Sequence, residues 1–99
     1  MNSYKVIEDN GGGLTLAIFE DGVCVYYHSG FEYGDPGEIA ECIANIDDWQ
    51  YWDGNSDDPQ GDYDSIASYE YGWKVIADND GVYPELMGAA GRREFGIDN

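Results

Sequence analysis

The fold is decided by residues 14–29, LTLAIFEDGVCVYYHS. Two runs rich in apolar residues, Leu14–Glu20 and Val23–Ser29, lie on either side of the dipeptide Asp21-Gly22. Asp-Gly between two such runs is typical of a two-residue hairpin turn, because both positions of that turn need a positive φ. We therefore predict two antiparallel strands joined at this dipeptide.

The turn length also predicts the register of the hairpin. A two-residue turn places Ile18 opposite Val25 and Leu16 opposite Tyr27. Successive side chains of a strand point to opposite faces of the sheet, and one of the two faces is more apolar. The expected core face carries Leu14, Leu16, Ile18, Val23, Val25 and Tyr27, and the other face carries Thr15, Ala17, Phe19, Cys24, Tyr26 and His28.

A further strand and a helix are expected on either side of the hairpin. Tyr4–Glu8 has the pattern of a strand, and the Gly-rich residues 10–13 form a turn. Downstream, Asp35 is suited to cap a helix that begins at Pro36, with Glu38 at capping-box spacing. The apolar stripe of this helix comprises Ile39, Cys42, Ile43 and Ile46. We expect the stripe to cover the core face of the hairpin, which leaves Cys42 and Cys24 on opposite sides of the sheet and unable to pair.

The second half of the chain has a weaker pattern. Residues 47–64 contain seven Asp, and Pro59 together with spaced Gly and Asp argues against regular structure there. Residues 65–71 fit a short helix or a strand, residues 73–77 predict the last strand, and residues 84–95 fit a short helix weakened by Gly. The expected fold is one α+β domain over residues 1–99: a small antiparallel sheet of about four strands with one main helix packed on one face.

Net charge is the outlying property of the chain. The 99 residues carry 21 Asp and Glu against four Lys and Arg, for a formal charge of −17. The 68 residues between Lys5 and Lys74 hold 16 carboxylates and no Lys or Arg. Solubility alone needs a net charge of about 2 to 8 in magnitude. The excess therefore indicates that the electrostatic field of the protein has a function. Nucleic acids and anionic membranes are repelled, and the expected ligand is a basic protein.

The candidate contact surface combines carboxylates with aromatic side chains. Carboxylates on strand ends and loops can form rows with a spacing of about 6.7 Å, which compete for a groove built to hold phosphates. Trp and Tyr are common anchors of protein interfaces. The predicted partner-binding residues are Asp47, Asp48, Tyr51, Trp52, Asp53, Asp57, Asp58, Asp62 and Asp64. Asp47 and Asp48 are expected at the C-terminal end of the helix, where the macrodipole disfavours anions, so stability alone would not select them.

Other aromatic residues have more than one interpretation. Trp49 is expected to continue the helix stripe and pin the loop to the core. Phe19, Tyr26 and His28 on the far face of the sheet form either a second contact surface or part of a second core layer covered by the C-terminal half.

Neither catalysis nor cofactor binding is indicated. His28 is the only histidine, and no third group orients it beside Cys24. An EF-hand-like spacing occurs at Asp53, Asn55, Asp57 and Asp64, but Asp58 and Pro59 occupy the positions of the turn glycine and the residue after it. The last position of this spacing holds Asp where the usual residue is Glu. We expect no enzymatic activity, no cofactor and no specific metal site, with weak divalent-metal binding by this segment as an alternative.

The expected location is the cytoplasm. Two cysteines do not form a disulfide framework. The first residues lack a secretory pattern, because Lys5 is soon followed by polar Glu8 and Asp9. No apolar run approaches the length of about 20 residues that a membrane span needs.

In size, charge and aromatic content the chain resembles the small anti-defence proteins of phages and mobile elements. These include anti-CRISPR and anti-restriction proteins, several of which mimic DNA. The resemblance implies an inhibitor that occupies the basic nucleic-acid-binding surface of a CRISPR effector or restriction enzyme of the bacterial host. The alternatives are an immunity protein or antitoxin that neutralises a basic nuclease toxin, a divalent-metal-binding regulator, and a structural protein in which the acidity is incidental.

Overall fold

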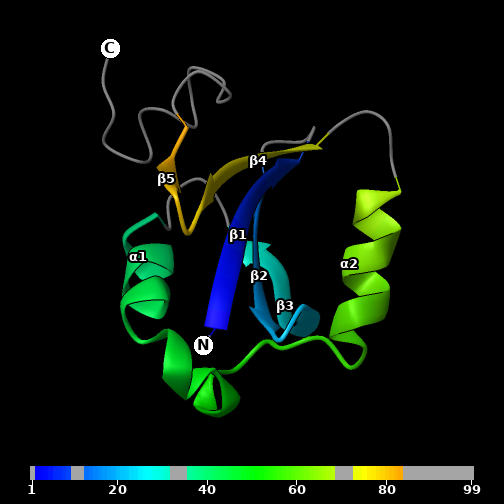
Figure 1. The fold of residues 1–99 in the computed structure, drawn as a ribbon, viewed down its shortest axis with the longest axis horizontal. Coiled ribbons are helices and arrows are strands. Elements are labelled where there is room, and N and C mark those ends of the chain that lie inside the picture. Colours follow the sequence, from blue (N-terminus) through cyan, green and yellow to red (C-terminus); the bar gives the residue numbers. More distant parts are fainter. Residues whose placement is uncertain (1, 10–12, 32–35, 69–72, 84–99) are drawn as a thin grey trace.

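The Asp21-Gly22 turn forms as predicted and joins β2 (Leu14–Glu20) to β3 (Val23–Phe31). Both turn residues adopt a positive φ, 53° for Asp21 and 83° for Gly22, as a type I′ turn requires. The computed structural model describes residues 2–9, 13–31, 36–68 and 73–83. The hairpin forms one side of a five-stranded sheet in the order β3-β2-β1-β4-β5 (Figure 1).

The central strand of this sheet is β1 (Asn2–Asp9), which pairs with β2 on one side and with β4 (Trp73–Asp78) on the other. A two-residue strand, β5 (Gly81–Val82), follows β4, so the predicted strand at residues 73–77 is not the last one. All paired strands are antiparallel. The predicted α+β class, with an antiparallel sheet and one main helix on one face, is confirmed.

The predicted register of the hairpin is wrong beyond its first residues. A bulge between Ile18 and Phe19 shifts the pairing, so that Ile18 lies opposite Tyr26 and Leu16 opposite His28. The extra residue, Val25, turns Tyr26, Tyr27 and His28 to the other face, up to a second register shift between Leu16 and Leu14. Tyr26 is therefore buried with Leu16 and Ile18, and Tyr27 joins Ala17, Phe19 and Cys24 on the opposite face. Val23, also expected in the core, is 53% exposed.

The main helix, α1 (Pro36–Ala44), covers the face that carries Leu16 and Ile18. Ile39 is fully buried, and the rest of the predicted stripe is partly buried against the same cluster. Asn45 ends the helix, and the 3₁₀ helix η1 (Ile46–Tyr51) follows. Asp47 and Asp48 lie in the first turn of η1, not at the end of a longer α-helix, which corrects the macrodipole argument. Trp49 packs against the core, as predicted.

The opposite face of the sheet is covered by a second helix, α2 (Pro59–Ala67), where irregular structure was expected. Proline breaks a helix interior but suits the first helical position, and Pro59 occupies that position. The side chain of Asp58 caps the helix by accepting a hydrogen bond from the Gly61 N–H at 3.2 Å. Residues 65–67, ambiguous in the sequence, complete α2.

Two side chains of α2 complete a second core layer. Tyr63 and Ile66 pack against the buried cluster of Ala17, Phe19, Cys24 and Tyr27. The rings of Tyr63 and Phe19 meet edge to face at 4.8 Å. Phe19 and Tyr26 consequently lie on different faces of the sheet, and the second contact surface considered for Phe19, Tyr26 and His28 does not exist.

The two cysteines and the lengths of the helices can also be compared with the predictions. Cys24 and Cys42 are both free and lie in different core clusters, as expected. Among the described helices, none is long and apolar enough to cross a membrane. The predicted cap Asp35, the helix expected at residues 84–95 and the Arg92-Arg93 pair lie outside the described residues.

Candidate partner-binding surface

The segment between η1 and α2 is fastened to the outer edge of β3. Asn55 accepts a hydrogen bond from the Tyr27 N–H through Oδ1 (3.0 Å) and donates one to the Val25 carbonyl through Nδ2 (3.1 Å). The Ser56 N–H donates to the Tyr27 carbonyl at 3.0 Å, and Gln60 Oε1 accepts from the Cys24 N–H at 2.7 Å. These groups occupy the positions that a neighbouring strand would otherwise fill, so the edge of β3 is covered and the segment is held in place.

This use of Asn55 conflicts with the calcium alternative. Both polar atoms of its side chain face the backbone of β3, and Asp64 lies on α2, where its carboxylate accepts a hydrogen bond from Gln60 Nε2 at 2.8 Å. Within the described ranges, no group of three or more His, Cys, Asp or Glu side chains is placed to hold a metal ion. The EF-hand-like spacing therefore does not assemble into a loop of converging oxygen ligands.

A second attachment links the same segment to His28. The Nδ1 atom of His28 lies 3.0 Å from the Gly54 carbonyl oxygen. Gly54 has a φ of 86°, and a Cβ atom at this position would lie 2.7 Å from the imidazole ring. Only glycine satisfies both the positive φ and the close approach. His28 therefore has a structural role, because its contact with Gly54 fixes the path of the chain after η1.

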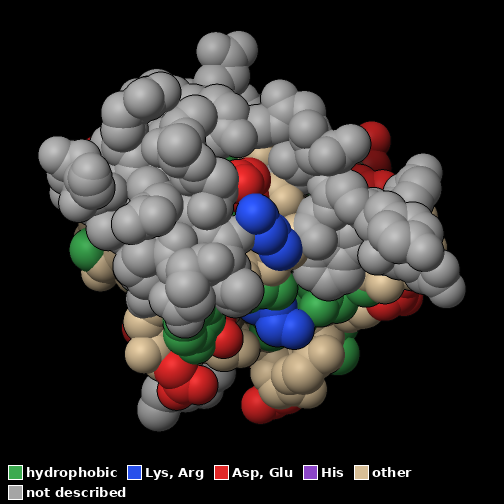
Figure 2. Space-filling view, turned by 90° about the horizontal axis from the view of Figure 1, so that it is seen from above, with side chains coloured by type: hydrophobic (Ala, Val, Ile, Leu, Met, Phe, Trp, Pro, Cys, Tyr) green, Lys and Arg blue, Asp and Glu red, His purple; other side chains and the backbone are tan. Residues whose placement is uncertain are grey.

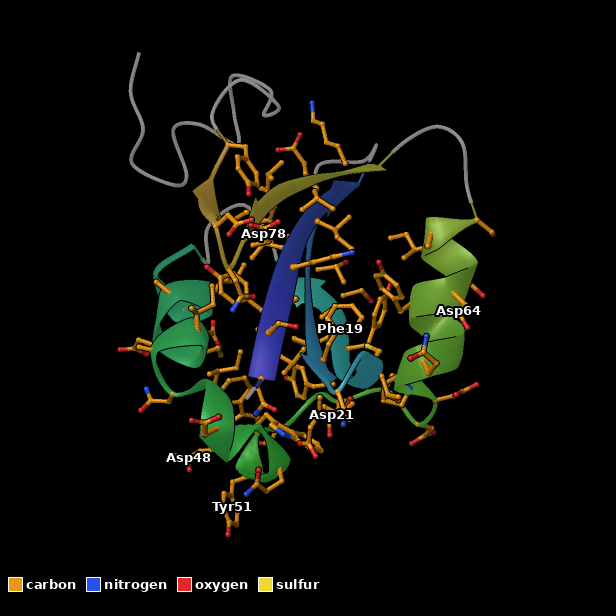
Figure 3. The ribbon with its side chains drawn as sticks, in the orientation of Figure 1. Phe19, Asp21, Asp48, Tyr51, Asp64 and Asp78 are labelled. Carbon is orange, nitrogen blue, oxygen red and sulfur yellow. The ribbon has the colours of Figure 1, made fainter. Side chains whose placement is uncertain are left out.

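The exposed carboxylates of residues 38–64 form what we call the acidic belt. Its nine members come from α1, η1, the connecting segment and α2, and every one is exposed. They are Glu38, Glu41, Asp47, Asp48, Asp53, Asp57, Asp58, Asp62 and Asp64. Because α1 and α2 lie on opposite sides of the sheet, the belt passes around the molecule from one face to the other. Figure 3 shows Asp48 and Asp64 on opposite sides, with their carboxylates directed outward.

Within the described part of the chain, no cation compensates the charge of the belt. Among the described residues, the positive side chains are those of Lys5 and Lys74, and neither pairs with a belt carboxylate. Lys74 lies 3.7 Å from the carboxylate of buried Glu8, and Lys5 donates a hydrogen bond to the Tyr63 hydroxyl at 2.9 Å. Figure 2 shows the lysine atoms near the middle of one side of the molecule, with most carboxylates at its margins. The separation leaves the belt as a surface of one sign.

Two aromatic residues that we predicted to bind a partner differ in exposure. Tyr51 is 81% exposed at the end of η1 and projects away from the molecule (Figure 3). Trp52 is partly buried, and its ring meets that of Tyr26 edge to face at 5.4 Å. Tyr51 therefore offers a largely exposed aromatic side chain, and Trp52 combines a structural contact with a partly exposed surface.

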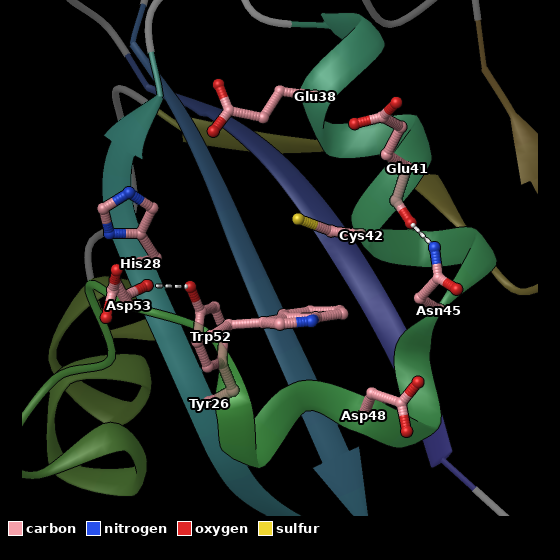
Figure 4. A pocket seen from close by; sticks show the side chains of 9 residues that line it. All are labelled: Tyr26, His28, Glu38, Glu41, Cys42, Asn45, Asp48, Trp52 and Asp53. Carbon is pink, nitrogen blue, oxygen red and sulfur yellow. Dashed lines mark hydrogen bonds between the residues drawn. The ribbon is translucent and has the colours of Figure 1, made fainter.

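A pocket of 490 Å³ lies where the belt passes over Trp52. It is lined by Tyr26, His28, Glu38, Glu41, Cys42, Asn45, Asp48, Trp52 and Asp53 (Figure 4). The Tyr26 hydroxyl donates a hydrogen bond to the Asp53 carbonyl at 2.8 Å, which ties the pocket floor to the connecting segment.

The pocket favours neutral forms of its acidic groups Tyr26 and Cys42. Burial raises the pKa of Tyr26 to about 12, and the negative groups around it add to this effect. Burial also raises the pKa of the Cys42 thiol, with further contributions from Glu38 and Glu41. Thiolate chemistry at Cys42 is therefore disfavoured, and the environment is one that stabilises positive charge.

The structure places all nine predicted contact residues on the segment between η1 and α2 or on these helices, and it adds others. Glu38 and Glu41 belong to the same belt and line the pocket, although the only role expected of Glu38 was to complete the helix cap. Each directly precedes a residue of the buried stripe, Ile39 or Cys42, and a helical pattern places both on one side of that stripe. Tyr26 could not have been found, because the bulge at Val25 has no signature in the sequence.

Comparison with known proteins gives no assignment for this fold and surface. No protein-family model, no curated protein and no solved structure matches the chain significantly. The function therefore has to be argued from the charge and geometry of the surface.

Proposed function

We propose that this protein inhibits a nucleic-acid-binding protein by occupying its basic binding surface in place of DNA. The observation that carries the proposal is the acidic belt, in which nine exposed carboxylates follow one another with no lysine or arginine among them. A protein that gained only solubility from its charge would not need so large an excess on one continuous segment. A field of this sign attracts a basic groove over a long distance and speeds association.

The size of the protein supports the comparison with DNA. Its extents are 35 × 29 × 23 Å, and one turn of duplex DNA is about 34 Å long. Such a turn carries about 20 phosphate charges, since the duplex has one charge per about 1.7 Å of axis. About half of these charges face a protein bound on one side, a number similar to the nine carboxylates of the belt. Because the belt passes from one face of the protein to the other, it would present these charges to a groove that encloses the molecule.

The proposed target class is a defence complex of a bacterial host, such as a CRISPR effector or a restriction enzyme, with the inhibitor acting in the cytoplasm. This narrower assignment rests on the resemblance in size, charge and composition to phage anti-defence proteins. In this interaction the carboxylates take phosphate positions, and exposed Tyr51 adds apolar contact that persists when salt screens the charges.

The test is a pull-down with the tagged protein from a lysate that contains CRISPR and restriction machinery, followed by competition with duplex DNA. We expect capture of a DNA-binding effector at low salt, its release by duplex DNA, and weaker capture at high salt. Capture of a basic nuclease toxin would indicate immunity instead. A target that holds this protein and DNA at the same time would refute the mimicry.

Two variants of equal net charge test whether the belt itself makes the contact. D48N/D53N/D57N removes three belt carboxylates, and E20Q/D21N/D80N removes three exposed carboxylates outside the belt. We expect the first variant to bind the target more weakly than the second. Equal losses in both would assign the attraction to total charge, without a defined face.

A further inference from the structure

The pocket beside Trp52 has the composition of a cation site. Among the described residues that line it, four are carboxylates and none is a lysine or arginine. Trp52 and Tyr26 supply aromatic surface between the carboxylates of α1 and those near η1. Its volume of 490 Å³ falls within the range of about 300 to 1,000 Å³ typical of ligand sites. An uncharged or anionic ligand would leave the carboxylates without a partner of opposite sign.

The positions of these groups favour a planar cation. Figure 4 shows the Cys42 side chain directed from α1 toward the Trp52 indole, with the Glu38 and Glu41 carboxylates on the same side of the indole, beyond the thiol. The Tyr26 ring packs edge to face against the indole, with the ring centroids 5.4 Å apart and an interplanar angle of 87°. A cation on the ring face would meet the negative face of the indole from one side and the carboxylates of α1 from the other.

Arginine meets these requirements better than lysine. Its guanidinium is planar, is weakly hydrated, stacks on aromatic rings and offers several N–H donors to neighbouring carboxylates. We propose that this pocket receives an arginine side chain of the basic partner, with the guanidinium stacked on Trp52 and paired with Glu38 and Glu41. The inference rests on the proposed function and identifies the anchor of that interface: an arginine that would otherwise hold a phosphate.

The test uses the intact protein and two small probes, N-acetylarginine amide and N-acetyllysine amide. Amide and indole N–H resonances are followed by NMR during titration, and the Trp52 indole signal is assigned with the Trp52→Phe variant. We expect a saturable shift of the Trp52 indole and of the backbone around Glu38 with the arginine probe at millimolar concentration. The lysine probe is expected to bind at least about threefold more weakly. Equal response to both probes would overturn the stacking proposal.

Two further variants of equal charge separate the pocket from the general field. E38Q/E41Q is expected to weaken binding of the arginine probe about fivefold, since two carboxylate partners are lost. E20Q/D21N removes the same charge from the β2–β3 turn, outside the acidic belt, and is expected to leave that binding nearly unchanged. Equal weakening by both variants would refute a defined arginine site, as would an unchanged affinity in E38Q/E41Q.

This outcome is independent of the test of the proposed function. If the arginine probe fails and DNA still displaces the captured target, the belt is a mimic without this anchor. If the probe binds and DNA does not compete with the target, the arginine pocket stands and the mimicry is wrong.

Discussion

Replacing Asn55 with alanine should destabilise the protein and, at the same time, weaken the attachment of the segment between η1 and α2 to β3. The change removes the acceptor for the Tyr27 N–H and the donor to the Val25 carbonyl, which lie 3.0 and 3.1 Å from the Asn55 side chain. Each such bond contributes about 1 kcal/mol. Water can reach the exposed Asn55 and replace part of this loss, so the expected decrease in the free energy of unfolding is about 1 to 2 kcal/mol.

Urea unfolding followed by tryptophan fluorescence measures this decrease, and hydrogen exchange at the Tyr27 amide measures the local effect. The matched control is Asn45→Ala, because Asn45 is also exposed but its side chain bonds only to the Glu41 carbonyl one helical turn away. We expect that control to cost about 0.5 kcal/mol or less. An Asn55→Ala protein as stable as the control, with an unchanged Tyr27 amide, would show that the edge of β3 does not hold the segment.

Four other predictions concern charge, strain, ionisation and binding. Raising NaCl from about 0.01 to 0.15 M shortens the Debye length from about 30 to 8 Å. Because this screens the repulsion among the carboxylates of a chain with a net charge of −17, the free energy of unfolding in urea should increase. A decrease would contradict self-repulsion. Gly54→Ala should cost about 1 to 3 kcal/mol in the same assay, because its φ is 86° and its Cβ would meet His28; a neutral effect would show that the segment moves freely. Burial raises the pKa of Tyr26 to about 12, so on raising the pH the Tyr26 phenol ionises in the unfolded chain first, at about pH 10. The contribution of Tyr26 to stability is therefore full below about pH 10 and is lost as the pH rises toward the pKa of Tyr26 in the folded protein. Tyr26→Phe should flatten this decrease in stability. Tyr51→Ala should leave stability unchanged, because the side chain is 81% exposed, but weaken binding to the captured target about tenfold, a loss that persists at high salt; unchanged affinity would exclude Tyr51 as an anchor.

Much of the fold was predictable because its signals are local. The Asp21-Gly22 turn, the strands around it, and the start of α1 at Pro36 with buried Ile39 all depend on residues close together in the sequence. The excess of negative charge between Lys5 and Lys74 was equally plain. These features depend on backbone preference, periodicity and composition, which can be read from the sequence without knowledge of the tertiary structure.

Other features depended on contacts between distant residues. The bulge at Val25 follows from packing, and it moved Tyr26 to the face with Leu16 and turned Tyr27 away from it. The helix α2 was missed because its polar segment has little apolar periodicity. Besides the Asp58 cap, burial of Tyr63 and Ile66 against the second face stabilises it.

The sequence by itself determined that this protein is a small α+β domain with a large uncompensated negative charge. The tertiary structure decided where that charge lies: α1 and α2 cover opposite faces, and Asn55 fastens the chain between them to the edge of β3. It also brought Glu38, Glu41 and Trp52 to the lining of one pocket, although they belong to different elements of the chain. The physical reason is that charge is a sum over residues, whereas a surface or pocket depends on the long-range packing that brings those residues together.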